Sequence, residues 1–253
     1  MQFLRSQLAA LGLLAATTLL APACQRAGYV PTAKLAPATA QPVGPALAEN
    51  PAALDLIAPY RQRVTEQMTT VLGQAPAAIT KNPGESPLAN FVGDLQRQRA
   101  SRELGQPVDL GVMSNGGLRA PIPAGPVTMG AVFELMPFEN ELVVLSTPGP
   151  VVQQLFDYAA RVKMPVSGAV YAVTQEGKPT SISIGGQPFD LARTYTIAIS
   201  DYLAGGGDNM TFFKTLKPRG TGILLRTAIA DHIREQTQQG KAIQAAVEGR
   251  VKL

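Results

Sequence analysis

The sequence contains one cysteine, one histidine and no tryptophan. A single cysteine, Cys24, excludes a disulfide framework within the chain. A single histidine, His232, excludes a His-rich metal centre and permits at most one His-based catalytic dyad or triad. The 22 basic and 18 acidic residues form no block of one sign, so the charge pattern does not favour nucleic-acid binding.

Several common catalytic motifs are also missing. The sequence has no G-x-x-x-x-G-K-S/T phosphate loop, no G-x-S-x-G nucleophile turn, and no H-E-x-x-H or C-x-x-C motif. His232 lies between Ile229 and Ile233 in a predicted helix, and we interpret it as a packed or surface histidine. These absences exclude the catalytic sites that a sequence reveals most readily.

The overall composition is that of a folded protein. Hydrophobic residues make up 45% of the 253 residues and charged residues 16%, with 24 glycines and 21 prolines. This apolar content can bury a core, which excludes disorder of the whole chain. The length allows one sizeable domain or two small ones.

Residues 1–23 have the pattern of a signal peptide. A basic start is followed by an apolar run from Leu8 to Leu20, which is shorter than the roughly 20 residues that span a bilayer. Two interpretations of the end of this segment remain open. Signal peptidase could cut after Ala23 and leave a free thiol, or Cys24 could be lipidated and become the new amino terminus. We favour lipidation, because a lone thiol in an oxidising compartment has no other evident use.

Residues 24–49 are rich in proline, alanine, threonine and glycine. Such a segment buries too little surface to fold, so we expect a flexible tether. Two acyl chains on Cys24 would give a stable anchor. The expected location is therefore the bacterial cell envelope, with a membrane-anchored lipoprotein facing the periplasm or the cell surface.

Residues 50–253 are predicted to form a single α+β domain. The apolar spacing predicts helices that begin near Pro51, Ser86, Thr128, Val151 and Thr227, and strands over 77–80, 108–113, 142–145, 169–174, 181–184 and 195–199. The first helix is expected to run on to Leu72. Because a hairpin signal at 175–178 lies among alternating helices and strands, we expect mixed sheets with helices on their outer faces.

Four segments resemble, in order and spacing, the C-terminal domain of the 5′-nucleotidase/UDP-sugar hydrolase family. They are E-S-P-L-A-N from Glu85, V-M-S-N-G-G-L-R from Val112, M-P-F-E-N-E-L-V from Met136 and S-D-Y-L-A-G-G-G-D from Ser200. Each segment is weak evidence alone, but four in register make the resemblance specific. It covers about residues 50–253 and implies a domain of α/β/β/α layers.

The residues of these segments also have a chemistry of their own. Backbone N–H groups can approach a ligand closely at glycines, and Arg119 carries a permanently charged fork suited to phosphate. The rings of Phe138 and Tyr202 could stack on the two faces of a base, and Asp208 could accept hydrogen bonds from ribose hydroxyls. The resemblance implies the same roles. The expected substrate-binding residues are Ser114, Asn115, Gly116, Gly117, Arg119, Phe138, Asn140, Tyr202 and Asp208.

A structural interpretation of these residues remains open. Phe138 and Tyr202 could be core aromatics, Arg119 a surface ion pair, and the glycines before Asp208 a turn. The sequence also departs from the family pattern. Tyr202 stands where phenylalanine is usual in the family. Family members often carry an arginine shortly before the first segment, and this chain has only a lysine, Lys81, near that position.

The resemblance also shows what is missing. Family enzymes join this domain to an N-terminal metallophosphatase domain that binds two divalent metals. Such a two-metal centre needs several ligand side chains. With one histidine and no room for a second domain before Asn50, we expect no catalytic residue, metal or cofactor in this chain. Divalent metals would then belong to a separate metallophosphatase chain, and the chain by itself would be inactive.

Three functions fit these expectations. The leading one is the nucleotide-recognising half of a split 5′-nucleotidase, in which the helix from Pro51 is the candidate docking element. The second is a stand-alone nucleoside- or nucleotide-binding lipoprotein without catalysis. The third is a structural envelope lipoprotein without a ligand, which the joint presence of Arg119, Phe138, Asn140 and Asp208 disfavours.

Overall fold

The computed structural model describes Gly44 and residues 47–253. The expected signal peptide, Cys24 and nearly all of the expected tether lie outside the described residues. Residues Pro51–Leu253 form one compact unit. No helix in the described part of the chain is both long enough and apolar enough to cross a bilayer.

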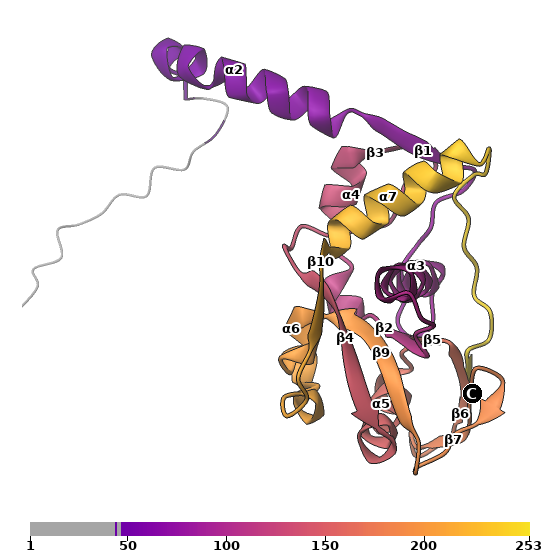
Figure 1. Ribbon diagram of the computed structural model, residues 1–253. Coiled ribbons are helices and arrows are strands. Elements are labelled where there is room, and N and C mark those ends of the chain that lie inside the picture. Colours follow the sequence, from indigo (N-terminus) through magenta and orange to yellow (C-terminus); the bar gives the residue numbers. More distant parts are fainter. Residues whose placement is uncertain (1–43, 45–46) are drawn as a thin grey trace, which may run out of the picture. The chain divides into compact units, whose positions relative to one another are not determined.

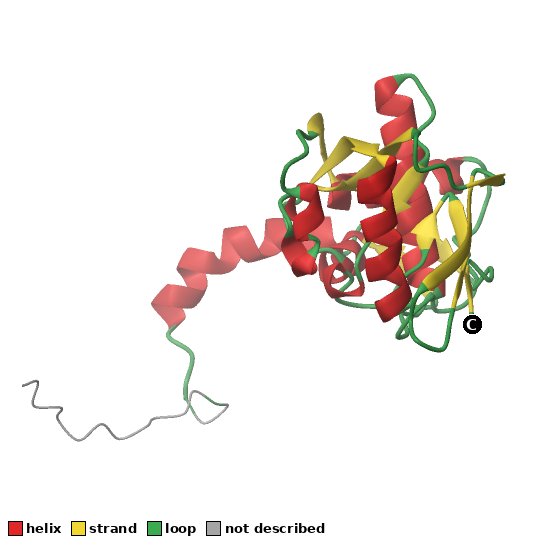
Figure 2. Ribbon diagram, turned by 90° about the horizontal axis from the view of Figure 1, so that it is seen from below, coloured by secondary structure: helices red, strands yellow, loops and turns green. Residues whose placement is uncertain are grey.

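A five-stranded mixed sheet forms the centre of this unit (Figures 1 and 2). Its strands are β10 (Arg219–Leu224), β4 (Glu141–Pro148), β9 (Thr194–Ser200), β2 (Leu110–Val112) and β5 (Val166–Ser167), in that spatial order. Strands β2 and β9 are parallel, and the other neighbours are antiparallel. The α+β fold predicted from the sequence is confirmed.

Both faces of the central sheet are buried. In β9, Ile197 and Ile199 belong to one hydrophobic core and Ala198 to the other, as the alternation of a strand requires. Helices α3 (Pro87–Leu104) and α7 (Leu225–Gln238) contribute to one core, and α5 (Gly149–Val162) contributes to the other. The sheet is therefore a rigid base for the loops at its edges.

Two smaller sheets complete the unit. Strands β1 (Val71–Ala75) and β3 (Gly125–Thr128) pair antiparallel, and β1 packs against α7. The other sheet has the order β11 (Val251–Lys252), β6 (Ala169–Val173), β7 (Pro179–Ile184) and β8 (Gln187–Pro188). Its β6–β7 hairpin was expected from the sequence.

Helix starts follow the predicted caps. The Ser86 hydroxyl accepts a hydrogen bond from the N–H of Ala89 (3.3 Å) at the start of α3. Thr128 caps the start of α4 (Met129–Leu135) in the same way, by accepting from Ala131 (3.2 Å).

Two sequence predictions were wrong in detail. Helix α2 (Pro51–Met68) ends before Leu72, which lies in β1 and is buried there. The apolar spacing continued at helical period, but pairing with β3 decides the backbone conformation. The strand expected over 77–80 is reduced to a single bridge between Ile79 and Ile122.

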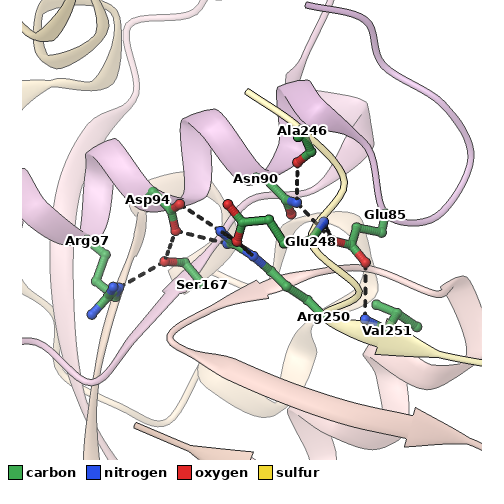
Figure 3. A network of polar contacts seen from close by, with 9 residues as sticks. All are labelled: Glu85, Asn90, Asp94, Arg97, Ser167, Ala246, Glu248, Arg250 and Val251. Carbon is green, nitrogen blue, oxygen red and sulfur yellow. Dashed lines mark hydrogen bonds and ion pairs between the residues drawn. The ribbon is translucent and has the colours of Figure 1, made fainter. Parts of the chain in front are cut away.

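The last residues of the chain cross α3 and join the β6 sheet (Figures 1 and 3). The Glu85 carboxylate accepts hydrogen bonds from the N–H groups of Glu248 (2.9 Å) and Val251 (3.2 Å). Arg250 forms a two-point ion pair with Asp94, at 2.9 and 2.7 Å, and its side chain is 8% exposed. The first family-like segment thus holds the C-terminal segment in place.

Candidate functional site

Three loops that are distant in sequence meet at one edge of the central sheet. Because β2 and β9 are parallel neighbours, both carboxyl ends lie at that edge. Strand β4 is antiparallel to β9, with Leu142 opposite Ser200, so its amino end lies there too. The predicted site residues follow β2, precede β4 and follow β9.

The loop after β2 is held by a hydrogen bond of its own and by the side chain of Lys81. The Ser114 hydroxyl accepts a hydrogen bond from the N–H of Gly117 (3.3 Å). The Lys81 ammonium donates to the carbonyl oxygens of Asn115 (3.1 Å) and Leu118 (2.7 Å). A Cβ at Gly117 would meet the terminal methyl group of Met113, so a larger residue at this position needs that flexible side chain to move.

The loop before β4 carries Phe138, whose side chain is 40% exposed. The Arg226 guanidinium, from α7, lies over the ring of Phe133 at 4.2 Å from its centroid. It also donates long hydrogen bonds to the carbonyl oxygens of Met136, Pro137 and Phe138, at 3.3–3.5 Å. One cation therefore contacts three consecutive peptide groups of the loop.

The loop after β9 begins with α6 (Asp201–Ala204). Tyr202 is 52% exposed, and its hydroxyl donates a hydrogen bond to Oδ1 of Asp208 (3.0 Å). The same hydroxyl accepts from the N–H of Asp208 (3.3 Å). Gly206, with φ of 91°, makes the reversal that brings the two residues together.

The three loops enclose a cavity of about 330 Å³. This volume is at the lower end of the range for small-molecule pockets, roughly 300–1,000 Å³. The lining residues are Gly116, Gly117, Arg119, Phe138, Asn140, Tyr202 and Asp208. Since the two aromatic side chains are exposed at the cavity, they are not core aromatics.

Ser114 and Asn115, the other two predicted residues, line an adjacent cavity of about 190 Å³. Gly116 and Asp208 line both cavities. Ser114 is 5% exposed and Asn115 donates to the carbonyl oxygen of Asn82 (3.0 Å). Both side chains therefore shape the loop that carries Gly116.

Sequence reasoning missed the contribution of Arg226. Its carbonyl partners lie 88 to 90 residues earlier in the chain, so no local pattern marks it. Lys81 was noted for its position near the first family-like segment, but not for its bonds to the Asn115 loop.

His232 lies on α7 outside the candidate site. Its ring contacts Phe91 edge to face, with centroids 5.5 Å apart, and it lines a separate cavity of about 260 Å³. Burial lowers the pKa of His232 below its ordinary value, which favours the neutral form. This is the environment of a packed histidine.

The described residues do not fit a dimetal centre. Within residues 47–253, no group of three His, Cys, Asp or Glu side chains is placed to hold a metal ion. The candidate cavity contributes one carboxylate, from Asp208. Its other side chains offer two rings, an amide and a guanidinium.

Known proteins resemble this chain over the same region. A 33% identical relative, silent protein UshA(0) of Salmonella typhimurium, covers 65% of this chain, which spans 30% of that protein. Cell wall protein Lmo0130 of Listeria monocytogenes is 30% identical over 66% of this chain and 23% of its own length. The crystal structure of a 5′-nucleotidase precursor from Thermus thermophilus matches with a TM-score of 0.67 and 27% identity, over 79% of this chain and 43% of that chain.

The chain thus spans less than a third of the length of these curated relatives. The family described as 5′-nucleotidase, C-terminal domain, matches residues 63–215, which is more than half of the chain. That match includes all three loops of the candidate site. The chain belongs to the 5′-nucleotidase C-terminal domain family.

Proposed function

We propose that the cavity binds a nucleoside or nucleotide. The observation that carries this proposal is the meeting of two exposed rings, a guanidinium and a carboxylate around one cavity of ligand size. Phe138 and Tyr202 stack on the base, which contributes about 1–3 kcal/mol for each base stacked. The resemblance to known 5′-nucleotidases supports this assignment.

Three polar side chains of the cavity bind the sugar, the phosphate and the edge of the base. Asp208 accepts hydrogen bonds from the sugar, since a carboxylate has only acceptors to offer. Arg119 lies exposed on the cavity wall and donates to the carbonyl oxygen of Gly116 (3.3 Å), which leaves guanidinium donors for phosphate. Asn140 contacts the edge of the base through its amide.

We further propose that hydrolysis needs a second chain. Two divalent metals on a separate metallophosphatase would supply a hydroxide and stabilise the leaving oxygen. Helix α2 supports such docking, because it has no buried residue and exposes Leu56, Tyr60 and Val64. A helix with this much exposed apolar surface is typical of an interface.

The proposed location is the bacterial envelope. The amino-terminal pattern of the sequence and the name of the Listeria relative, a cell wall protein, support it. Lipidation of Cys24 would anchor the domain at the membrane surface. A stand-alone nucleoside-binding lipoprotein is the second candidate function, favoured because the cavity lining includes two rings, a carboxylate and a guanidinium that could bind a ligand.

Calorimetric titration with adenosine and AMP tests the binding proposal. We expect Asp208→Ala to weaken both ligands at least tenfold, because a hydrogen bond to a charged group contributes about 1.5–3 kcal/mol. Asp157→Ala is the matched control, since Asp157 is exposed on α5 and lines neither cavity. Unchanged affinity in Asp208→Ala would place the site elsewhere.

Phosphate release from AMP tests the second chain. The protein is assayed alone and mixed with a secreted metallophosphatase that lacks this domain, with Mn²⁺ or Zn²⁺. We expect release from the mixture at a rate above that of the metallophosphatase alone. Release by this chain alone would contradict the split-enzyme proposal, and binding without stimulation would favour the stand-alone function.

A further inference from the structure

A separate cavity is lined by α3, α7 and residues 242–248 of the C-terminal segment, which runs beside both helices (Figure 1). Its volume is about 260 Å³, close to the lower limit of small-molecule pockets, roughly 300 Å³. It shares no lining residue with the cavity proposed to bind nucleotides. Phe91, Leu95 and Ile243 line it as buried apolar residues, and Gln98 and Gln244 line it as exposed polar ones. The cavity therefore combines an apolar inner wall with a polar rim.

The polar lining has unused hydrogen-bonding capacity. Within the described part of the chain, no hydrogen bond is made by the side chains of Gln98, His232, Gln236 and Gln244. Burial lowers the pKa of His232, so its ring is neutral and offers one donor and one acceptor. Asn90, which is 2% exposed, adds a side-chain oxygen that has no partner in the same part of the chain. Amides and a neutral imidazole both donate and accept, and hydroxyl groups are their natural partners because they do the same.

The charges of the lining favour a neutral ligand. Asp94 and Glu248 supply two carboxylates, and none of the residues that line this cavity is a lysine or an arginine. An anion would therefore be repelled. A cation gains less from the two carboxylates than from free ones, because the Arg250 guanidinium already lies 2.6–3.0 Å from both.

We propose that this cavity binds a neutral monosaccharide, an inference that does not depend on the proposed function. A sugar ring carries hydroxyl groups around its edge and C–H groups on its faces. The hydroxyl groups bond to His232 and to the amides of Gln98 and Gln244, and the C–H groups pack against the apolar wall that includes Phe91.

The single histidine of the chain is a direct probe of this cavity. In untagged protein, the imidazole signals of an NMR spectrum come from His232 alone. The protein is titrated at constant pH with D-ribose, D-glucose or N-acetyl-D-glucosamine, each to millimolar concentration. We expect at least one sugar to shift the imidazole signals in a saturable manner, and inorganic phosphate to leave them unchanged.

A double variant that combines Gln98→Ala with Gln244→Ala removes two amides from the rim. We expect it to bind the sugar about tenfold more weakly, because the hydrogen bonds of both amides are lost. The two side chains are exposed, so the fold should tolerate the change. Gln154→Ala is the matched control, since Gln154 is an exposed glutamine of α5 that does not line this cavity, and its affinity should equal that of the unaltered protein.

Three results would overturn this inference. The first is the absence of a saturable shift with any of the three sugars. The second is a shift of equal size with inorganic phosphate, and the third is equal sugar affinity in the double variant and the unaltered protein. None of them would bear on nucleotide binding, which is assigned to Phe138, Tyr202 and Asp208 in the other cavity.

Discussion

Arg226 is a cation held mainly by neutral oxygen atoms and a ring. Its side chain is 13% exposed, and the nearest carboxylate oxygen, from Glu139, is 3.7 Å away. The three carbonyl oxygens and the Phe133 ring therefore carry most of its interactions, and cation–π contacts of this kind contribute about 0.5–2 kcal/mol. The Phe138 loop takes its shape from this residue.

We predict that Arg226→Ala weakens adenosine binding about tenfold and increases hydrogen exchange at the amides of residues 138–140. The physical reason is that Phe138 loses the support that presents its ring to the cavity. Exchange in the ligand-free protein and calorimetry measure the two effects.

Arg234→Ala is the control for this prediction. Arg234 lies on the same helix, pairs with Asp231 at 3.2 Å and is 43% exposed, so we expect little change. Equal exchange in both variants would contradict the role assigned to Arg226.

The residues of the cavity differ in how far the sequence reveals them. Phe138, Tyr202 and Asp208 stand in recognisable segments and could be named in advance. Arg226 could not, because a guanidinium that bonds distant backbone carbonyls imposes no pattern on its own neighbours. The bond between Tyr202 and Asp208 could not be foreseen either, since it depends on the reversal at Gly206.

At the scale of elements, the turn after α6 positions both residues of the Tyr202–Asp208 pair. We predict that Gly207→Ala displaces the Tyr202 ring and weakens adenosine binding about tenfold, because the added Cβ would occupy the space of the ring. Near-ultraviolet circular dichroism reports the ring, and calorimetry reports the affinity.

Gly205→Ala is the control for this turn. The φ of Gly205 is −73°, and its Cβ would lie 3.3 Å from the carbonyl oxygen of Asp201 and 3.5 Å from that of Tyr202. Alanine is therefore accommodated after a small shift. If the two variants bind adenosine equally, the ring does not depend on Gly207.

The helices other than α6, and strands β2, β4, β6, β7 and β9, could be predicted because their apolar spacing and caps are local. Strands β1, β3 and β10 could not. The residues of β10 include Gly220 and Gly222, and those of β3 include Pro126, which are poor strand formers. Their conformation comes from pairing with β4 and β1, which a single sequence does not show.

At the scale of the whole compact unit, Arg250 fastens the C-terminal segment to α3. We predict that Arg250→Ala lowers the free energy of unfolding by about 2–4 kcal/mol, because the partly buried Asp94 carboxylate loses its cationic partner and keeps only the Ser167 hydroxyl. Urea denaturation measures the loss. Lys252→Ala, an exposed neighbour, should change it by less than about 0.5 kcal/mol, and an equal loss in both variants would contradict the assignment.

The parallel pairing of β2 with β9 has a kinetic consequence. Asp109, the residue before β2, and Thr196 in β9 are joined by hydrogen bonds and are 87 residues apart. Closing so long a loop costs conformational entropy before the contacts between the two strands can form. Proteins dominated by such distant pairings therefore fold slowly. The cavity walls cannot meet until that closure is complete, so recovery of adenosine binding during refolding would be a late event.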